Sequence, residues 1–150
     1  MTYRAMEEDD IERIIPLYME YYNGTEGGGW TWQTTHKRIH QVFGREDSYC
    51  MVLEEAGELV AFAMGYFEQY DDGFAYDLIE IVVAASWQKK GIGTRFMHEL
   101  EERVREMGAM LIQLNSVNDD FHEHFYGKLG YGDASNFVLK TKMLRQEKEM

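Results

Sequence analysis

The chain has 150 residues and a formal net charge of −12, because 27 Asp and Glu residues outnumber 15 Lys and Arg residues. This length suits one domain of roughly 100–200 residues, so we expect residues 1–150 to form a single domain. An excess of negative charge would repel phosphate backbones, and we therefore expect no nucleic-acid partner. The sequence has neither a run of roughly 20 apolar residues nor an apolar signal segment, which predicts no membrane partner and a cytoplasmic location.

Strand-like and helix-like segments alternate along the N-terminal half. Apolar side chains at Ile11, Ile14, Ile15, Tyr18 and Tyr22 form one face of a helix, and an Asn-Gly pair follows it and ends it. Two later apolar runs are joined by a short turn and predict an antiparallel hairpin. The elements predicted for this half are a strand at 3–6, helices at 11–22 and 31–43, and strands at 49–53 and 59–67.

The C-terminal half predicts a crossover between parallel strands. Residues 74–83 are apolar on both faces, which is typical of a central strand covered on both sides. A helix at 91–107 and a strand at 110–117 follow, and a strand–helix–strand passage implies a right-handed parallel connection. The sequence therefore predicts an α/β fold, a mixed sheet with helices on both faces. A short helix at 119–129, a last strand at 137–144 and a fraying polar tail at 146–150 complete the predicted elements.

A glycine-rich turn, Gln88-Lys89-Lys90-Gly91-Ile92-Gly93-Thr94, lies between the central strand and the clearest helix. Backbone amides at a helix start have no partner within the helix, and with the helix dipole they form an anion site. The two glycines allow a pyrophosphate close to the backbone, the lysines add positive charge, and the threonine adds a hydroxyl donor. The turn lacks the Gly-Lys-Ser/Thr ending of a nucleoside triphosphatase loop, and its letters alone also fit a plain tight turn.

Residues 83–93, Val-Ala-Ala-Ser-Trp-Gln-Lys-Lys-Gly-Ile-Gly, resemble the strand-to-helix acetyl-CoA motif of the GNAT superfamily of N-acetyltransferases, Gln/Arg-x-x-Gly-x-Gly/Ala. Residues 125–131, Phe-Tyr-Gly-Lys-Leu-Gly-Tyr, are similar to the second signature of that family. The order of elements matches across nearly the whole chain, which implies a mostly antiparallel, twisted GNAT-like sheet. Three positions depart from the family pattern: Ala85 replaces a usual proline, Asp119 stands where asparagine is frequent, and His122 stands where a small residue is common.

The resemblance implies an acetyl-CoA-dependent N-acetyltransferase in which a deprotonated amine attacks the thioester directly. Acetyl-CoA would be a cosubstrate, and its pantetheine would pair with the backbone near Val82 and Val83. Asn118, next to Asp119, which differs from the family pattern, is a further candidate contact to the cofactor. The pyrophosphate would lie on the glycine-rich turn. The residues of this turn that would bind the cofactor are Gln88, Lys89, Lys90, Gly91, Ile92, Gly93 and Thr94.

Three residues are candidates for proton transfer. Tyr126 matches the family position that often protonates the leaving thiolate, although it could instead pack the end of its helix. Asp77 and Glu80 are the only charged residues in 74–83, and a buried carboxylate needs a reason to be there. Being three residues apart, they would face opposite sides of a strand unless a bulge intervenes. Either could be the base, with a water chain or a structural salt bridge as the alternatives.

The resemblance also implies that the segment between the first two helices forms a wall of the acceptor site. Four of the six residues from Gly24 to Gly29 are glycine, as a mobile lid requires, and Glu26, Trp30 and Trp32 could bind a cation. The alternative is a loop whose tryptophans pack on the core. Glu68 and Tyr70 end the neighbouring hairpin strand and are further substrate candidates, unless they belong to a solvated turn.

We therefore expect the acceptor to be a primary amine of a small cationic molecule, such as a polyamine, an aminoglycoside or an amino-sugar. A protein N-terminus or a lysine is the alternative acceptor, and a non-catalytic acyl-CoA sensor or a plain interaction module is the alternative class. No metal is expected, because one cysteine and scattered histidines do not form a ligand set. Dimers are frequent in the family, and by that analogy alone a homodimer is one expectation.

Overall fold

The computed structural model describes residues 1–145, which form two compact units, one of residues 1–116 and one that begins at Val117. The polar tail expected at 146–150 lies outside the described residues. Along residues 1–145, none of the helices is long and apolar enough to cross a membrane.

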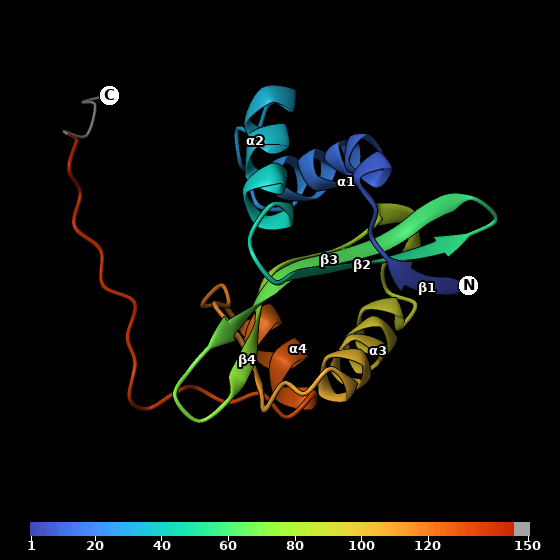
Figure 1. The fold of residues 1–150 in the computed structure, drawn as a ribbon. Coiled ribbons are helices and arrows are strands. Elements are labelled where there is room, and N and C mark those ends of the chain that lie inside the picture. Colours follow the sequence, from blue (N-terminus) through green and yellow to red (C-terminus); the bar gives the residue numbers. More distant parts are fainter. Residues whose placement is uncertain (146–150) are drawn as a thin grey trace. The chain divides into compact units, whose positions relative to one another are not determined.

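The first unit is built on a five-stranded sheet (Figure 1). The strands lie side by side in chain order, β1 to β4 antiparallel to their neighbours and β5 parallel to β4. This confirms the expected α/β fold with a mixed, mostly antiparallel sheet. The strands are β1 (Thr2–Ala5), β2 (Ser48–Glu55), β3 (Glu58–Gln69), β4 (Phe74–Val83) and β5 (Ile112–Leu114).

Helices cover both faces of this sheet (Figure 1). Helices α1 (Ile11–Gly24) and α2 (Trp32–Phe43) lie on one face, and α3 (Ile92–Glu106) lies on the other. Short 3-10 turns precede α1 at Glu8–Asp10 and α3 at Ala85–Trp87. The hairpin between β2 and β3 closes through Ala56 and Gly57, whose φ angles of 50° and 81° match the twist of paired strands.

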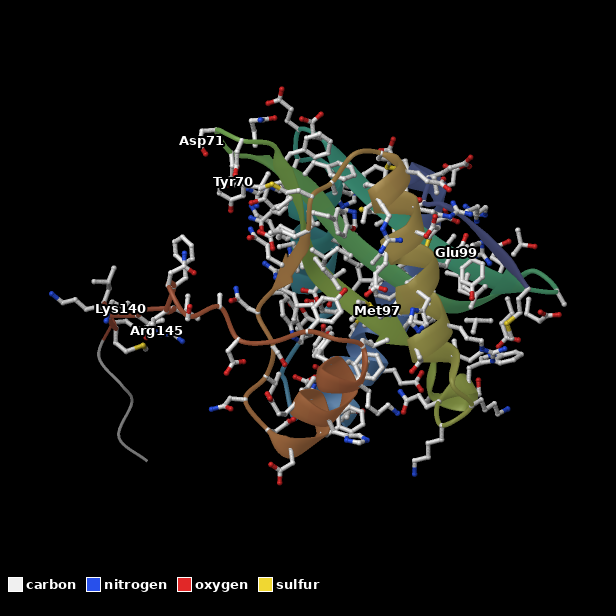
Figure 2. All side chains as sticks on the ribbon, turned by 90° about the horizontal axis from the view of Figure 1, so that it is seen from below. Tyr70, Asp71, Met97, Glu99, Lys140 and Arg145 are labelled. Carbon is white, nitrogen blue, oxygen red and sulfur yellow. The ribbon has the colours of Figure 1, made fainter. Side chains whose placement is uncertain are left out.

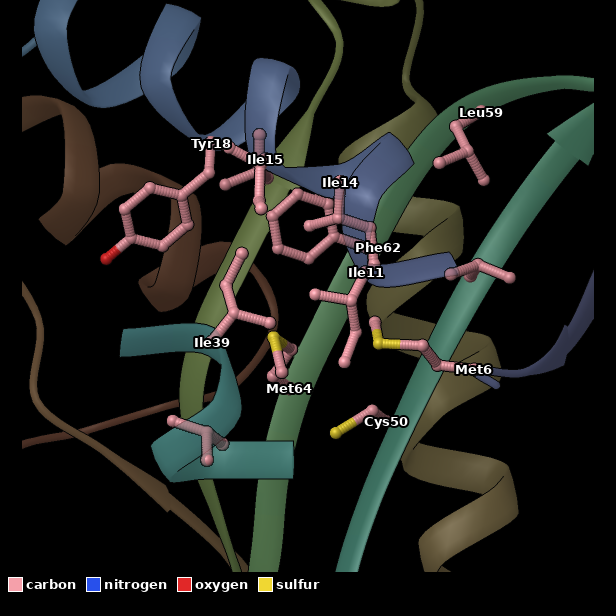
Figure 3. Packing of buried hydrophobic residues seen from close by; sticks show 13 residues of the cluster. Met6, Ile11, Ile14, Ile15, Tyr18, Ile39, Cys50, Leu59, Phe62 and Met64 are labelled. Carbon is pink, nitrogen blue, oxygen red and sulfur yellow. The ribbon is translucent and has the colours of Figure 1, made fainter. Parts of the chain in front are cut away.

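The alternation of side chains along the strands divides the core in two. One set of buried apolar side chains lies between the sheet and helices α1 and α2 (Figure 3). Burial of each large apolar side chain contributes about 1.5–3 kcal/mol. The other set lies on the α3 side of the sheet, as the period of two requires. The first set includes Ile11, Ile14, Ile15, Tyr18, Ile39, Cys50, Val52, Phe62 and Met64, and α3 buries Phe96, Met97, Leu100 and Val104.

Strand β4 contains a bulge beside Gly65 of β3. Met64 pairs with Glu80, but the next residue, Gly65, pairs with Leu78, so Ile79 is an extra residue on β4. An extra residue of this kind bends the strand and interrupts its alternation.

The bulge places two carboxylates on the same face of the sheet. Met64 and Tyr66 of β3 point to one side because side chains alternate, and their partners across the ladder are Glu80 and Asp77. Met64 packs in the core beneath α1 and α2. Asp77 and Glu80 therefore both face those two helices, which a regular strand would not allow.

The second unit contains one helix, α4 (Asp120–Lys128), among its described residues. Asp119 caps it by accepting a hydrogen bond from the His122 N–H at 2.7 Å. Gly130, with a φ of 91°, follows the helix end. The short helix predicted here is therefore present.

Two strand predictions need correction. The strand predicted at 137–144 is wrong, because these residues have no regular structure and Phe137, Val138 and Leu139 are 75–77% exposed. The apolar pattern there is a local property, whereas a strand also needs a hydrogen-bonded partner. The strand predicted at 110–117 is shortened to Ile112–Leu114, which pairs with the three β4 residues before the bulge.

Candidate active site

The glycine-rich turn connects β4 to α3. Gln88 Nε2 donates to the Val83 carbonyl at 3.0 Å and so ties the start of the turn to the end of the strand. Lys89 and Gly91 both have positive φ angles, 62° and 76°. Gly91 is the N-cap of α3, and glycine adopts this left-handed conformation without strain.

The start of α3 offers an anion-binding surface. The Arg95 N–H donates to the Gly91 carbonyl at 3.2 Å, so the amides of Ile92, Gly93 and Thr94 precede the hydrogen-bonded ladder of the helix. A Cβ atom at Gly91 would meet nothing within 4 Å, which leaves open space beside these amides. An anionic group can therefore approach the backbone closely.

Three cationic side chains surround this surface. Lys89, Lys90 and Arg95 are exposed, and the Lys90 Nζ lies 5.2 Å from the centre of the Trp87 ring. Arg95 Nη2 donates to the Lys90 carbonyl at 3.3 Å, which places the guanidinium next to the turn. In a chain with a net charge of −12, this is a local concentration of positive charge.

The edge of β4 that faces away from β3 is unpaired over half its length. β5 accompanies β4 only from Tyr76 to Leu78, so within residues 1–145 no strand pairs with residues 79–83 on that side. An exposed strand edge presents backbone donors and acceptors in a row, and it can pair with an extended amide-containing ligand. This edge leads directly into the turn and contains the predicted cofactor residues Val82 and Val83.

Glu80 is a buried carboxylate with three donors. It is 6% exposed, and its Oε1 accepts from the Tyr18 hydroxyl at 3.2 Å and from Arg38 Nε at 3.1 Å. Its Oε2 accepts a short hydrogen bond from the Tyr22 hydroxyl. Burial and the Glu80 charge raise the pKa of both phenols well above the ordinary value for tyrosine, so both hydroxyls stay protonated and donate.

Asp77 lies on the same face in a less buried position. Burial raises the pKa of its carboxyl, and the charge of Glu68 adds to this effect, whereas hydrogen bonding from Tyr66 and Gln113 opposes it. The ring of Tyr66 lies 3.7 Å beneath the Arg45 guanidinium. Asp77 is thus a carboxylate whose proton is held more tightly than in water.

The glycine-rich segment after α1 is fastened to the helix. Asn23 bridges both backbone groups of Trp30, accepting from its N–H and donating to its carbonyl, each at 2.8 Å. The Trp30 ring packs edge-on against Tyr18 with 5.0 Å between ring centroids. Trp30 thus packs on the core, as in the alternative interpretation of this loop.

The other predicted substrate residues lie further out. Glu26 is exposed, and Trp32, the first residue of α2, is 49% exposed. Figure 2 shows Tyr70 at the outer end of the β3–β4 hairpin, where its hydroxyl accepts from Gln113 Nε2 at 2.9 Å. Glu68 is near enough to Asp77 to raise the pKa of that carboxyl. A contact between any of them and an acceptor stays a prediction.

Two predicted residues belong to the second unit. Asn118 is exposed just before α4. Tyr126 lies within α4, and its ring packs against Phe125 and Tyr131 with centroids 5.1 and 5.7 Å away. Their roles at the cofactor stay predictions. Among residues 1–145, no group of three or more His, Cys, Asp or Glu side chains is placed to hold a metal ion.

The sequence interpretation missed the side chains that hold Glu80. Tyr18 and Tyr22 were assigned to an apolar helix face, and Arg38 was assigned no role. The signal was present, because two tyrosines four residues apart place two hydroxyls on the same face of a helix. The position of Glu80 in a strand with few charges was the other half of that signal.

Comparison with known proteins places this chain in a family. The model of the acetyltransferase (GNAT) family matches residues 11–131. An uncharacterized N-acetyltransferase from Archaeoglobus fulgidus is 25% identical over 118 residues, which cover 76% of this chain and 80% of that protein.

Solved structures share the fold. A predicted acetyltransferase from Clostridium acetobutylicum, crystallised with acetyl-CoA, has a TM-score of 0.74 at 16% identity over 93% of this chain and 95% of that one. An aminoglycoside acetyltransferase from an uncultured soil metagenomic sample, in complex with sisomicin, has a TM-score of 0.75 at 16% identity over 96% of both chains.

The fold is shared with acetyltransferases of known structure. The match over residues 11–131 makes the family explicit, and the chain belongs to the acetyltransferase (GNAT) family.

Proposed function

We propose that this protein transfers an acetyl group from acetyl-CoA to a primary amine of a small cationic molecule. The observation that carries the proposal is the continuous surface formed by the free edge of β4 and the start of α3. The strand edge suits the amides of pantetheine, and the helix start suits the pyrophosphate. Acetyl-CoA supplies the activated acetyl group as a thioester when it is bound.

The residues of the turn fit a pyrophosphate. The unpaired amides of Ile92, Gly93 and Thr94 would donate to its oxygens, and Lys89 and Lys90 would balance its charge. The open space beside Gly91 supports this assignment, because a ligand there meets no side chain. Asn118 is proposed as a further cofactor contact from the resemblance to the family.

The acidic face of the sheet supports a cationic acceptor. Asp77 and Glu80 face the same side, and Glu68 lies close enough to act on Asp77. A carboxylate near the acceptor favours a bound ammonium, and a carboxylate can accept the proton, directly or through a relay, that an amine must lose before it attacks. The sisomicin complex of the aminoglycoside acetyltransferase of similar fold agrees with a small polycationic acceptor.

Tyr126 is proposed as the acid that protonates the departing thiolate. A phenol with a pKa near ~10 matches the basicity of a thiolate leaving group. The family match runs from residue 11 to residue 131 and so crosses the boundary between the two units after Ser116. We therefore propose one acetyltransferase domain that includes both units, with cytoplasmic location and homodimer formation remaining predictions from the sequence.

The test is amine-dependent release of thiol from acetyl-CoA, measured with spermidine, sisomicin, glucosamine, glycine and a short lysine-containing peptide. We expect release with the first three and little with the peptide. Release with the peptide alone would favour a protein acceptor instead, and tight acetyl-CoA binding without release would favour a sensor.

Gly91→Val tests the cofactor surface. A branched side chain at a φ of 76° is strained and fills the open space beside the amides. We expect acetyl-CoA affinity, measured by titration calorimetry, to fall at least about tenfold, equivalent to 1.4 kcal/mol. Unchanged affinity in a folded variant would contradict the assignment of the turn.

A further inference from the structure

Glu80 is too deeply buried to touch an acceptor amine directly. It is 6% exposed, and its two carboxylate oxygens already accept hydrogen bonds from Tyr18, Tyr22 and Arg38. If Glu80 is to receive a proton from the acceptor, the proton must pass through one of the groups that contact it. The three donors differ in ways that decide which one can do so.

Two of the three donors are unsuited to the task. Tyr18 is 1% exposed, so an acceptor in solvent cannot contact its side chain directly (Figure 3). Arg38 reaches solvent with 40% of its side chain exposed, but a guanidinium does not give up its proton in proteins. Arg38 can hold and orient Glu80 without carrying a proton.

Tyr22 is the donor that combines a transferable proton with access to the predicted acceptor loop. Its side chain is partly exposed, and its hydroxyl donates to Glu80 Oε2. Its backbone carbonyl accepts the Gly28 N–H at 2.9 Å, which fastens the glycine-rich loop to the same turn of α1. The charge of Glu26, also in that loop, acts on the Tyr22 hydroxyl.

We propose that the Tyr22 hydroxyl relays a proton from the acceptor ammonium to the buried Glu80 carboxylate. This inference rests on the proposed acetyl transfer. An N–H bond of the ammonium breaks as the Tyr22 oxygen accepts that proton, and the Tyr22 O–H bond breaks as its own proton passes to Glu80 Oε2. The products are a neutral amine, an unchanged phenol and a neutral carboxylic acid. The amine nitrogen then has a free electron pair with which to attack the thioester.

The phenol gains and loses a proton in the same event. Burial and the Glu80 charge raise the pKa of Tyr22 well above its ordinary value, so it does not act as a phenolate base. The titratable and charged groups that face it, or face the carboxylate it serves, are Tyr18 and Tyr21 on α1, Glu26 in the loop, Arg38 on α2 and Glu80 on β4.

Tyr22→Phe and Tyr18→Phe form a matched pair of variants. Each removes one hydroxyl that donates to Glu80 and leaves the ring in place, but the Tyr22 side chain is partly exposed whereas Tyr18 is buried. The assay is amine-dependent thiol release from pH 7 to 9.5 with spermidine or sisomicin. Acetyl-CoA affinity and thermal unfolding are measured for every variant as controls for cofactor binding and folding.

The relay predicts a specific change of pH profile. In the wild type, kcat/KM for the amine stays nearly flat below the pKa of the amine, because the bound ammonium is deprotonated on the enzyme. Tyr22→Phe must use amine that is already neutral in solution. Its kcat/KM should be about 100-fold lower at pH 7 and should rise about tenfold per pH unit.

The controls separate the relay from a loss of structure. We expect Tyr18→Phe to lower the rate by shifting Glu80 and to keep the flat profile. Glu80→Gln removes the final proton acceptor and should reproduce the rising profile of Tyr22→Phe, which provides a second test if one variant folds poorly. A flat profile for Tyr22→Phe overturns the relay and assigns the proton to Asp77 or to water. Wild-type protein that releases no thiol with any amine overturns the proposed function itself, and the relay with it.

Discussion

The bulge of β4 depends on the absence of a side chain at Gly65. A Cβ atom there would lie 2.3 Å from the Asp77 carbonyl oxygen and 2.6 Å from the ring and hydroxyl of Tyr76. Tyr76 cannot move aside easily, because it is fully buried and its hydroxyl donates to the Tyr49 carbonyl at 2.6 Å. Gly65→Ala must therefore push β4 away from β3 or displace the tyrosine.

The expected loss of unfolding free energy is about 3 kcal/mol, at the upper part of the range for overpacking. The upper part applies because one obstructing atom belongs to the backbone and the others belong to a buried, hydrogen-bonded ring. For a domain of this size the loss corresponds to a fall in Tm of about 6–12 °C. Urea unfolding at pH 7, followed by circular dichroism, gives the free energy directly.

Gly24→Ala is the matched control, since it adds the same methyl group at the last residue of α1. A Cβ atom there would meet nothing within 4 Å, and alanine favours a helix over glycine by about 0.5–1 kcal/mol. We expect this variant to be as stable as the wild type or slightly more stable. A loss below about 1 kcal/mol for Gly65→Ala would refute the argument that strand spacing at the bulge is fixed by close packing.

Two further predictions concern ionisable groups. Hydrogen bonding from Arg4 holds the pKa values of the Asp10 and Glu54 carboxyls below their usual range. The two ion pairs therefore contribute their full stability above the pKa values of the unfolded chain, about 4. This contribution is lost as the pH falls through the lowered pKa values of the folded protein. Arg4→Gln should cost about 2 kcal/mol at pH 7, between the values for exposed and buried pairs, and should flatten the acid side of a urea stability curve; an unchanged curve would contradict this role. Cys50 is 5% exposed, and burial raises the pKa of its thiol to about 11. Ellman's reagent should therefore react with it only after unfolding at pH 8, and rapid reaction with native protein would show that the core opens.

Local patterns in the sequence were sufficient for the elements and for the glycine-rich turn. The face formed by Ile11, Ile14 and Ile15 gives α1, and the residues from Gln88 to Thr94 give the start of α3, because in both cases the interacting groups are neighbours in the chain. The strand wrongly predicted at 137–144 shows the limit of such patterns. Alternation indicates a preference for extended structure, whereas pairing depends on a distant partner.

The surroundings of the two carboxylates depend on contacts that no local pattern contains. Tyr18 and Glu80 are 62 residues apart, and their hydrogen bond follows from the packing of α1 on β4. The sequence allows for a bulge between Asp77 and Glu80, but its presence at Ile79 depends on the close contact of Gly65 with Tyr76 across the ladder. The sequence could therefore predict Glu80 as a candidate without predicting the groups that surround it.

The two hydrogen bonds from Asn23 to the Trp30 backbone, both at 2.8 Å, have a consequence for how the acceptor range could be changed. They close the glycine-rich loop at its base, so the start of α2 does not depend on the length of the residues between them. The entropic cost of closing a loop rises by only about 0.6 kcal/mol for each doubling of the loop's length. Substitutions at Thr25, Glu26 and Gly29, which leave the crowded Gly28 in place, can therefore be selected for new acceptors while the buried carboxylate and the cofactor surface keep their positions. The loop is the natural region to vary in a library directed at acceptor specificity.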